Sequence, residues 1–152
     1  MKPIIIQETP FEKARKAIKK AKSPVIFTSN DDELNRKILE KEKIDILLIN
    51  QSKRKDWQKQ RNSGFNQVMA KEAKKNNVIL AINLDEILNS KGKAKAEILA
   101  RIKQNIKLCN KAKLQMTFIS QKYKKDPYDL KALGAVLGMP TWMLKEINHL
   151  PS

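Results

Sequence analysis

Five short, mostly apolar runs divide the chain, and each has the length of a β-strand. Residues 78–82 are apolar at every position, which is typical of a parallel strand covered on both faces. The pattern predicts strands over residues 3–7, 25–28, 44–49, 78–82 and 114–120.

Between these runs the apolar residues recur at helical spacing. In segment 62–77, Phe65, Val68, Met69 and Ala73 fall at i, i+3, i+4 and i+8, which places them on one inward stripe. Asn62 or Ser63 is the expected N-cap of that helix, and Thr9, followed by Pro10, that of the first. Further helices are predicted over 10–22, 30–43, 94–111, 126–138 (with Leu130, Leu133, Val136 and Leu137 inward) and 140–148, with a helical turn at 85–88.

A strand followed by a helix therefore occurs about five times, which predicts an α/β fold with right-handed crossovers and a parallel sheet. An open doubly wound sheet and a segment of a (β/α) barrel both fit this pattern, but five strands are too few for a standard eight-stranded barrel. We expect a single α/β domain over residues 1–152, with a basic loop insertion at 51–61 and a tail at 149–152.

The charge of the chain changes the functional picture. The 152 residues include 32 Lys and Arg against 16 Asp and Glu, a formal net charge of +16. An excess of this size points to a polyanionic partner: RNA, DNA or an anionic membrane surface. Lys outnumbers Arg, which favours phosphate neutralisation over bidentate base reading. An organism whose proteins are Lys-rich throughout would give the same composition.

Several kinds of site need residues that the sequence does not supply. The single cysteine, Cys109, excludes an internal disulfide and a cysteine zinc cluster, and the single histidine, His149, is expected to be an exposed tail residue. There is no G-x-G-x-x-G or phosphate-loop motif. The apolar runs fall short of the roughly 20 residues of a membrane span, so we expect a cytoplasmic protein with no membrane partner.

Carboxylates keep an enzymatic alternative open. Several follow or flank predicted strands, where oxygen ligands could hold magnesium. These are Asp31, Asp32, Glu33, Asp45, Asp85 and Asp126. Helix capping explains the first three equally well, and the spacing singles out no pair, so a metal-dependent nuclease remains the alternative to a binding protein.

Basic residues gather in three groups. The first is the loop with Lys53, Arg54, Lys55, Lys59, Arg61 and an unshielded Trp57; the second is the helical row Lys103, Lys107 and Lys111 flanked by Arg101; the third is Lys122, Lys124 and Lys125 around Tyr123. A solvated surface is the simpler interpretation of any one lysine. The first and third groups both follow strands, so they should lie at the same edge of the sheet, where we expect phosphate contact.

Three stretches together resemble the family of archaeal ribonuclease P protein component 3 and its eukaryotic thirty-kilodalton counterpart. They are N-S-G-F-N-Q-V-M-A-K with V-I-L-A-I-N-L-D-E-I-L over 62–88, R-I-K-Q-N-I-K-L-C-N-K over 101–111, and D-L-K-A-L-G-A-V-L-G-M over 129–139. The resemblance covers roughly residues 24–139. It implies a TIM-barrel-like fold related to metal-dependent (PHP-like) phosphoesterases but without their metal-binding histidines.

The resemblance also implies a function. The family binds and stabilises the catalytic RNA of ribonuclease P, which removes the 5′ leader from precursor tRNA. The chain would then not be catalytic alone and would bind no cofactor, because the magnesium ions act on the RNA. Its partners would be that RNA, precursor tRNA indirectly, and a second small protein subunit of the Pop-five type. The alternatives are a divergent barrel phosphoesterase and a general basic RNA-binding protein.

The resemblance also extends to single basic residues. The segment Arg54-Lys55-Asp56 resembles the family's basic R-K-D turn, although residues 57–62 intervene here and make Arg61 the other candidate. Lys71 and the row from Lys103 match basic family positions. The predicted RNA-binding residues are Lys53, Arg54, Lys55, Arg61, Lys71, Arg101, Lys103, Lys107, Lys122, Lys124 and Lys125. The family's first two strand–helix units have no counterpart here, which implies an N-terminally shortened, incomplete barrel of five to six strands with strand 3–7 at its edge, exposed or covered by a partner.

Overall fold

The computed structural model describes residues 2–147 and contains one parallel sheet of five strands in sequential order. The strands are β1 (Ile4–Ile6), β2 (Val25–Thr28), β3 (Ile46–Ile49), β4 (Ile79–Asn83) and β5 (Met116–Ile119). All four pairings are parallel, and the predicted strands are confirmed close to their expected limits. Met1 and residues 148–152 lie outside the described residues, and with them the predicted tail and His149.

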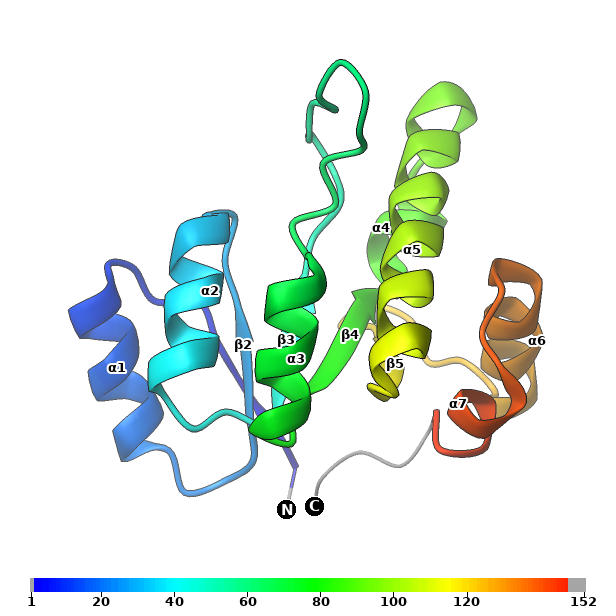
Figure 1. Cartoon of the computed structure of the whole chain (residues 1–152). Helices are drawn as coiled ribbons and strands as arrows, with labels where there is room; N and C mark the ends of the chain where they lie inside the picture. The colour runs from blue at the N-terminus through cyan, green and yellow to red at the C-terminus, as the bar shows by residue number, and fades with distance from the viewer. Residues whose placement is uncertain (1, 148–152) are drawn as a thin grey trace.

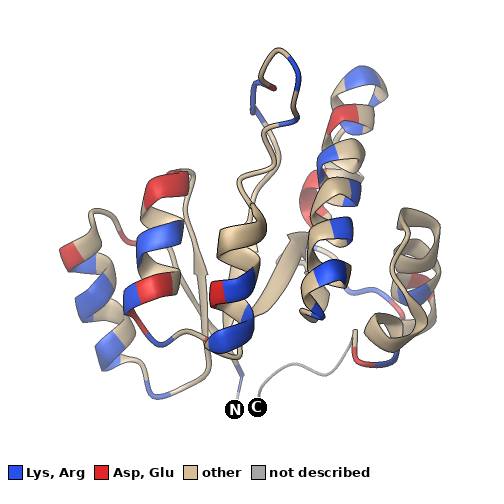
Figure 2. Cartoon of the chain, in the orientation of Figure 1, with Lys and Arg blue, Asp and Glu red and all other residues tan. Residues whose placement is uncertain are grey.

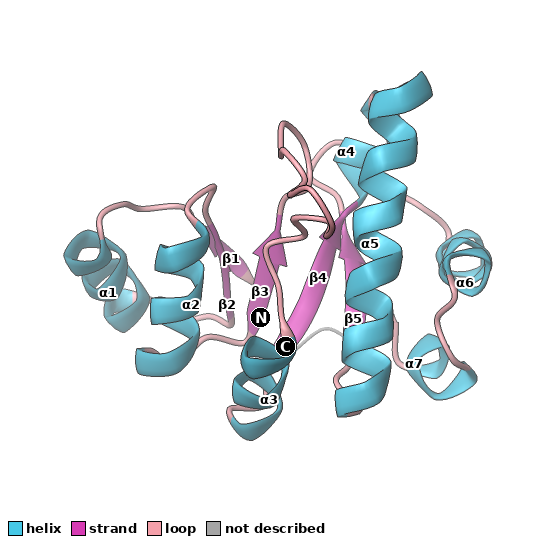
Figure 3. Cartoon of the chain, turned by 45° about the horizontal axis from the view of Figure 1, so that its top comes forward, coloured by secondary structure: helices cyan, strands magenta, loops and turns pink. Residues whose placement is uncertain are grey.

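The connections between the strands are helical. The helices are α1 (Phe11–Lys20), α2 (Asp32–Lys41), α3 (Gln67–Lys75), α4 (Leu84–Asn89), α5 (Gly92–Ala112), α6 (Pro127–Leu137) and α7 (Thr141–Lys145). Helices α1, α2, α3 and α5 lie side by side on one face of the sheet (Figures 1 and 3). Sequential strand order with helices on one face is the winding of a (β/α) barrel segment, and it excludes the doubly wound alternative.

Strands β2, β3 and β5 are buried at every position, as their apolar runs predict. Because successive side chains alternate, Phe27 and Leu47 pack under the helices, whereas Ile26 and Ile46 belong to a second cluster on the opposite face. The sheet does not close: β1 and β5 each have one hydrogen-bonded neighbour. At the β1 edge Ile4 is 42% exposed, in agreement with an open first strand.

Two helix faces differ from the prediction. Val68 is 67% exposed and Val136 is 78% exposed, although both were expected in the core. Helix α3 begins only at Gln67, with Asn66 as its N-cap, so Ser63 lies in the preceding loop and caps nothing. The buried residues of α3 are Met69, Ala70 and Ala73, so Met69 and Ala73 are buried as predicted and Ala70 takes the place of Val68.

Several other helix ends follow their local sequence. Asp31 caps α2, and Asp126 caps α6 directly before Pro127. Gly138 ends α6 in the left-handed region at φ 103°, as a C-terminal glycine should. In α1, however, Pro10 occupies the N-cap position and makes no side-chain cap bond, so Thr9 is not the cap. Across residues 2–147 no helix combines the length and apolar character needed to span a bilayer.

The exposed Val68 and the buried Met69 make a direct test of the corrected face of α3. We expect Met69→Ala to lower the free energy of unfolding by about 2 to 4 kcal/mol, because it opens a cavity in the core. Val68→Ala should change it by less than about 0.5 kcal/mol. Urea unfolding followed by circular dichroism measures both, and a larger loss for Val68→Ala would contradict this packing.

Candidate nucleic-acid interface

The carboxyl ends of the five parallel strands share one edge of the sheet, and the connections that follow β2, β3, β4 and β5 begin there. The connection after β3, residues 50–66, is the longest between described elements. It extends away from the body beside the N-terminal half of α5 (Figure 1). This segment contains the predicted basic loop, so its internal contacts decide which charges reach solvent.

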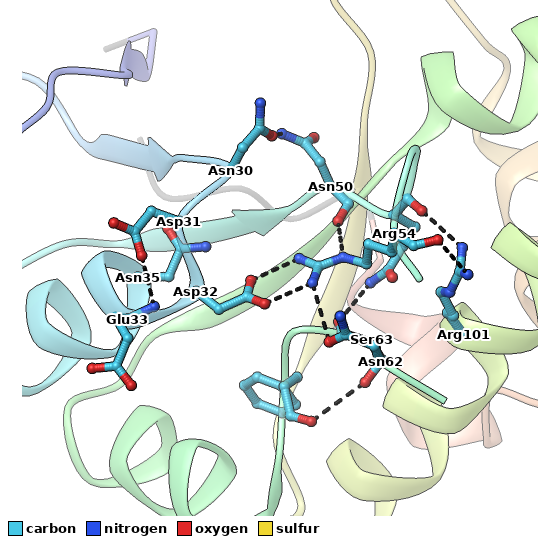
Figure 4. A network of polar contacts seen from close by, with 12 residues as sticks. Asn30, Asp31, Asp32, Glu33, Asn35, Asn50, Arg54, Asn62, Ser63 and Arg101 are labelled. Atoms are coloured by element: carbon cyan, nitrogen blue, oxygen red, sulfur yellow. Dashed lines mark hydrogen bonds and ion pairs between the residues drawn. The ribbon is translucent and has the colours of Figure 1, made fainter. Parts of the chain in front are cut away.

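Arg54 fixes the first half of the loop. Its guanidinium donates to both carboxylate oxygens of Asp32 at 2.7 and 2.8 Å, and its Nε donates to the carbonyl of Asn50 at 2.7 Å (Figure 4). Gly64 lies directly against this group: its φ is +73°, and a Cβ there would stand 2.4 Å from Arg54 Nη2. The guanidinium of Arg54, which could bind a phosphate, is therefore occupied by Asp32. Position 64 needs a glycine, because the loop passes directly against this guanidinium there.

Arg101 joins α5 to the loop from inside the protein. It is 3% exposed; its Nε donates to Asp56 Oδ1 at 3.0 Å, and its Nη1 and Nη2 donate to the carbonyls of Gln51 and Arg54 at 3.1 and 2.9 Å. Arg101 was predicted to contact RNA together with Lys103, but the phase of the helix turns Lys103 outward and Arg101 inward, where its donors bind the loop. A buried guanidinium needs such partners, and here they are the loop itself.

Asp56 closes the neck of the loop tip. Its carboxylate accepts the backbone N–H of Asn62 at 2.9 Å, together with Arg101 and, at 3.2 Å, Arg61. The hydrogen bond from Asn62 and the guanidinium of Arg101 hold the pKa of Asp56 below its ordinary value, although partial burial acts in the opposite direction.

Glu86, on α4, holds the start of the loop. Its two carboxylate oxygens accept the backbone N–H groups of Gln51 and Ser52 at 2.6 and 2.8 Å. The Gln51 side chain then donates to the carbonyl of Ser63 at 2.8 Å, across the base of the loop. Helices α2, α4 and α5 thus each hold part of the loop, and both of its ends are fixed.

The loop presents a small basic surface with one aromatic ring. Trp57 is 60% exposed, as predicted, and its N–H donates to the Gln60 carbonyl at 2.9 Å to close the tip. Lys53, Lys55 and Lys59 are exposed around it. Arg61 is half-exposed while paired with Asp56.

The helical lysine row lies on the outer face of α5. Lys103, Lys107 and Lys111 are all exposed, as predicted, and basic positions recur along α5 (Figure 2). None of them forms an ion pair within residues 2–147, where Lys93 is the one lysine with a carboxylate within 4.0 Å. Lys71 is exposed on α3, which packs against α5. These ammonium groups are therefore not neutralised by described carboxylates.

The third basic group follows β5. Lys122, Lys124 and Lys125 are exposed in the connection to α6, at the same edge of the sheet as the loop after β3. Tyr123 is also exposed, and its hydroxyl donates to Asn89 Oδ1 at 2.8 Å, which anchors the ring to α4. The structure therefore brings the first and third groups to one edge, while the row on α5 runs down the helical layer.

The carboxylates considered for magnesium do not converge. Asp31 and Asp126 cap helices, Asp32 is paired with Arg54, and Asp45 accepts a backbone N–H of β2 at the opposite edge of the sheet. Asp85 accepts hydrogen bonds from the connection after β5. In the part of the chain that the structure describes, no three His, Cys, Asp or Glu side chains are grouped to hold a metal ion.

A row of three amides at the carboxyl edge is absent from the predicted site residues. Asn83 Nδ2 donates to Asn50 Oδ1 at 2.9 Å, and Asn50 Nδ2 donates to Thr28 Oγ1 at 3.2 Å and to Asn30 Oδ1 at 3.4 Å. We call Asn30, Asn50 and Asn83 the amide row. The signal is present in the sequence, because an asparagine ends or closely follows each of three consecutive apolar runs.

Comparison with known proteins adds to this geometry. The family model described as RNase P subunit p30 matches residues 8–147. Ribonuclease P protein component 3 of Methanocaldococcus jannaschii is 32% identical over 116 residues, 74% of this chain and 47% of that protein. Its counterpart in Methanosarcina acetivorans is 29% identical over 119 residues, 76% and 47% of the two chains. The chain thus spans about half the length of these curated relatives.

One solved structure is similar throughout. A chain from the cryo-EM structure of archaeal ribonuclease P with mature tRNA matches 95% of this chain and 63% of its own length, with a TM-score of 0.76 and 25% identity. The sequential arrangement of strands and helices in this chain therefore occurs in a solved structure.

The internal role of Arg101 predicts a large effect on stability. We expect Arg101→Ala to lower the free energy of unfolding by about 2 to 3 kcal/mol, because two carbonyls and Asp56 lose their donor. Lys103→Ala, on the same helix but exposed, should change it by less than about 0.5 kcal/mol. Urea unfolding distinguishes the two, and equal small effects would contradict the clamp.

The lowered pKa of Asp56 predicts a pH dependence. A depressed folded-state pKa means that the stabilisation is complete above the unfolded-state pKa of about 4 and is lost as the pH falls through the folded value. The stability difference between the protein and its Asp56→Asn variant should therefore stay constant from about pH 8 to 5 and shrink below about pH 4. Urea midpoints across this range measure it; a difference that grows on acidification would contradict the assignment.

Proposed function

The chain belongs to the RNase P subunit p30 family, and from this premise we propose that it is a protein subunit of ribonuclease P that binds and stabilises the catalytic RNA. The observation that carries the proposal is the set of exposed lysines without carboxylate partners, set on a rigid scaffold within residues 2–147. Ammonium groups of this kind neutralise phosphates and release counterions, and they need no particular base sequence.

The same contacts support separate roles for the protein and the RNA. Cleavage of the 5′ leader of precursor tRNA would be carried out by the RNA with its magnesium ions, and the protein would act by holding that RNA. The engagement of Asp31, Asp32 and Asp85 in hydrogen bonds and ion pairs supports this assignment over a carboxylate nuclease. We place the subunit in the cytoplasm, in contact with precursor tRNA only through the RNA.

A second small protein subunit, of the Pop-five type, completes the proposal. The similar solved chain comes from an archaeal ribonuclease P with mature tRNA, which supports RNA and further subunits as partners. The open β1 edge, with Ile4 exposed, is a surface that such a subunit could cover.

Reconstitution tests the function directly. Precursor tRNA should be cleaved in magnesium when the ribonuclease P RNA and partner subunits are present, and this protein should increase the rate or lower the magnesium requirement. Cleavage by the protein without RNA would favour the phosphoesterase alternative. Equal affinity for unrelated structured RNA would favour a general basic RNA-binding protein.

The lysine row predicts a measurable salt effect. We expect Lys103→Ala with Lys107→Ala to weaken binding to ribonuclease P RNA across sequences and to reduce the log–log salt slope by roughly 1.4 to 1.8, at about 0.7 to 0.9 per phosphate. Lys16→Ala with Lys20→Ala is the matched control, because it removes the same charge at the same spacing from exposed positions on α1. Filter binding at several salt concentrations measures both pairs. Equal losses for the two would mean that net charge alone matters, and no loss for the first pair would remove the row from the interface.

A further inference from the structure

The amide row lies at the floor of a double hollow in the carboxyl edge of the sheet. Two adjoining cavities of about 560 and 580 Å³ are both lined by Asn30, Asn50 and Asn83. Ser52, Lys53 and Lys55 add polar groups to the wall of the first. We call these six residues and the space between them the amide crater. Its size is that of a small-molecule site and is too small for a duplex.

The acidic groups around the crater already have donors. Asp32 accepts from Arg54, and Glu86 accepts from two backbone N–H groups. Asp31 accepts the N–H groups at the start of α2. These carboxylates are thus partly neutralised by their neighbours, which reduces the repulsion that an anionic ligand would meet.

Several donors in the crater have no described partner. Asn30 Nδ2 has no partner within residues 2–147 and points away from the row (Figure 4). Asn83 uses one of its two amide hydrogens on Asn50. Lys53 and Lys55 add ammonium groups without a described carboxylate partner. A ligand that is rich in hydrogen-bond acceptors and carries negative charge therefore suits these amide and ammonium groups.

We propose that the amide crater binds one unpaired nucleotide of an RNA strand. The amide hydrogens of Asn30 and Asn83 donate to acceptor atoms on the edge of the base, and Lys53 and Lys55 bind the phosphate. Side-chain amides are well suited to base edges, and unpaired RNA nucleotides are commonly recognised in this way. The proposal rests on the RNA-binding function and adds a site that recognises a base as well as a phosphate.

The crater differs from the rest of the basic surface in what it selects. The lysines of α5 can hold any backbone phosphate, whereas an amide floor distinguishes a nucleotide from a sugar phosphate. Among residues 2–147 no aromatic ring lines the two cavities, so recognition here relies on hydrogen bonds and not on stacking. A small, base-containing probe therefore isolates this site from the lysine row.

Nuclear magnetic resonance of the full chain with ¹⁵N-labelled side-chain amides tests the site. The probes are the four nucleoside 5′-monophosphates, with ribose 5-phosphate and inorganic phosphate as comparisons. We expect at least one nucleotide to shift the side-chain signals of Asn30 and Asn83, and ribose 5-phosphate to leave them in place. Asn30→Ala should weaken that nucleotide about fivefold, the equivalent of one lost hydrogen bond of about 1 kcal/mol.

Gln58→Ala is the matched control, since Gln58 is an exposed amide on the same loop and lines neither cavity. It should leave nucleotide binding unchanged, and so should Lys103→Ala with Lys107→Ala. Amide signals that do not move with any nucleotide, or that move equally with inorganic phosphate, would overturn the proposal. A protein that binds nucleotides at the crater but does not bind ribonuclease P RNA would count against the proposed function and not against the crater.

Discussion

The ion pair between Arg101 and Asp56, with the two carbonyls that share the guanidinium, is the constraint on which the displayed surface depends. A charge buried to 3% exposure is stable only when its hydrogen-bonding capacity is met. Here the partners come from a loop about 45 residues earlier in the chain. The burial of Arg101 in the observed phase of the helix therefore depends on the loop, and the same contacts add a third anchor to those that Asp32 and Glu86 give the loop.

This arrangement explains how the charges are distributed. Carboxylates are outnumbered two to one by basic residues, and several of them are engaged near the base of the loop. Asp32 and Asp56 bind Arg54, Arg101 and Arg61, while Glu86 binds backbone N–H groups. The arginines, whose planar forks suit fixed pairs, take the structural positions, and the flexible lysines remain in solvent. Much of the positive excess is thus carried on exposed side chains attached to a firmly held backbone.

The strands were predictable because they are apolar on both faces, and five such runs separated by helical patterns leave few alternatives. The buried faces of the helices were less predictable. Because α3 begins at Gln67, Phe65 lies before the helix although it is buried, and Ala70 instead of Val68 joins Met69 and Ala73 on the buried face. The site was predictable as a set of charges but not as a set of contacts. In the sequence, Arg101 cannot be distinguished from the other basic residues near Lys103, because its partners are not known. The pairs Arg54–Asp32 and Glu86–Gln51 join segments that are far apart in the chain, so no local sequence pattern predicts them.

The hydrogen bond from the Asn62 N–H to Asp56 has a consequence for how this surface can vary. It brings the entering and leaving chains together, so residues 57–61 form a nearly closed ring outside the fold. Loop closure is already achieved at this neck, and adding residues to such a ring changes its entropy only slowly with length. The tip is therefore modular: its length and composition can change while the sheet, the helices and the contacts of Arg54 and Arg101 stay as they are.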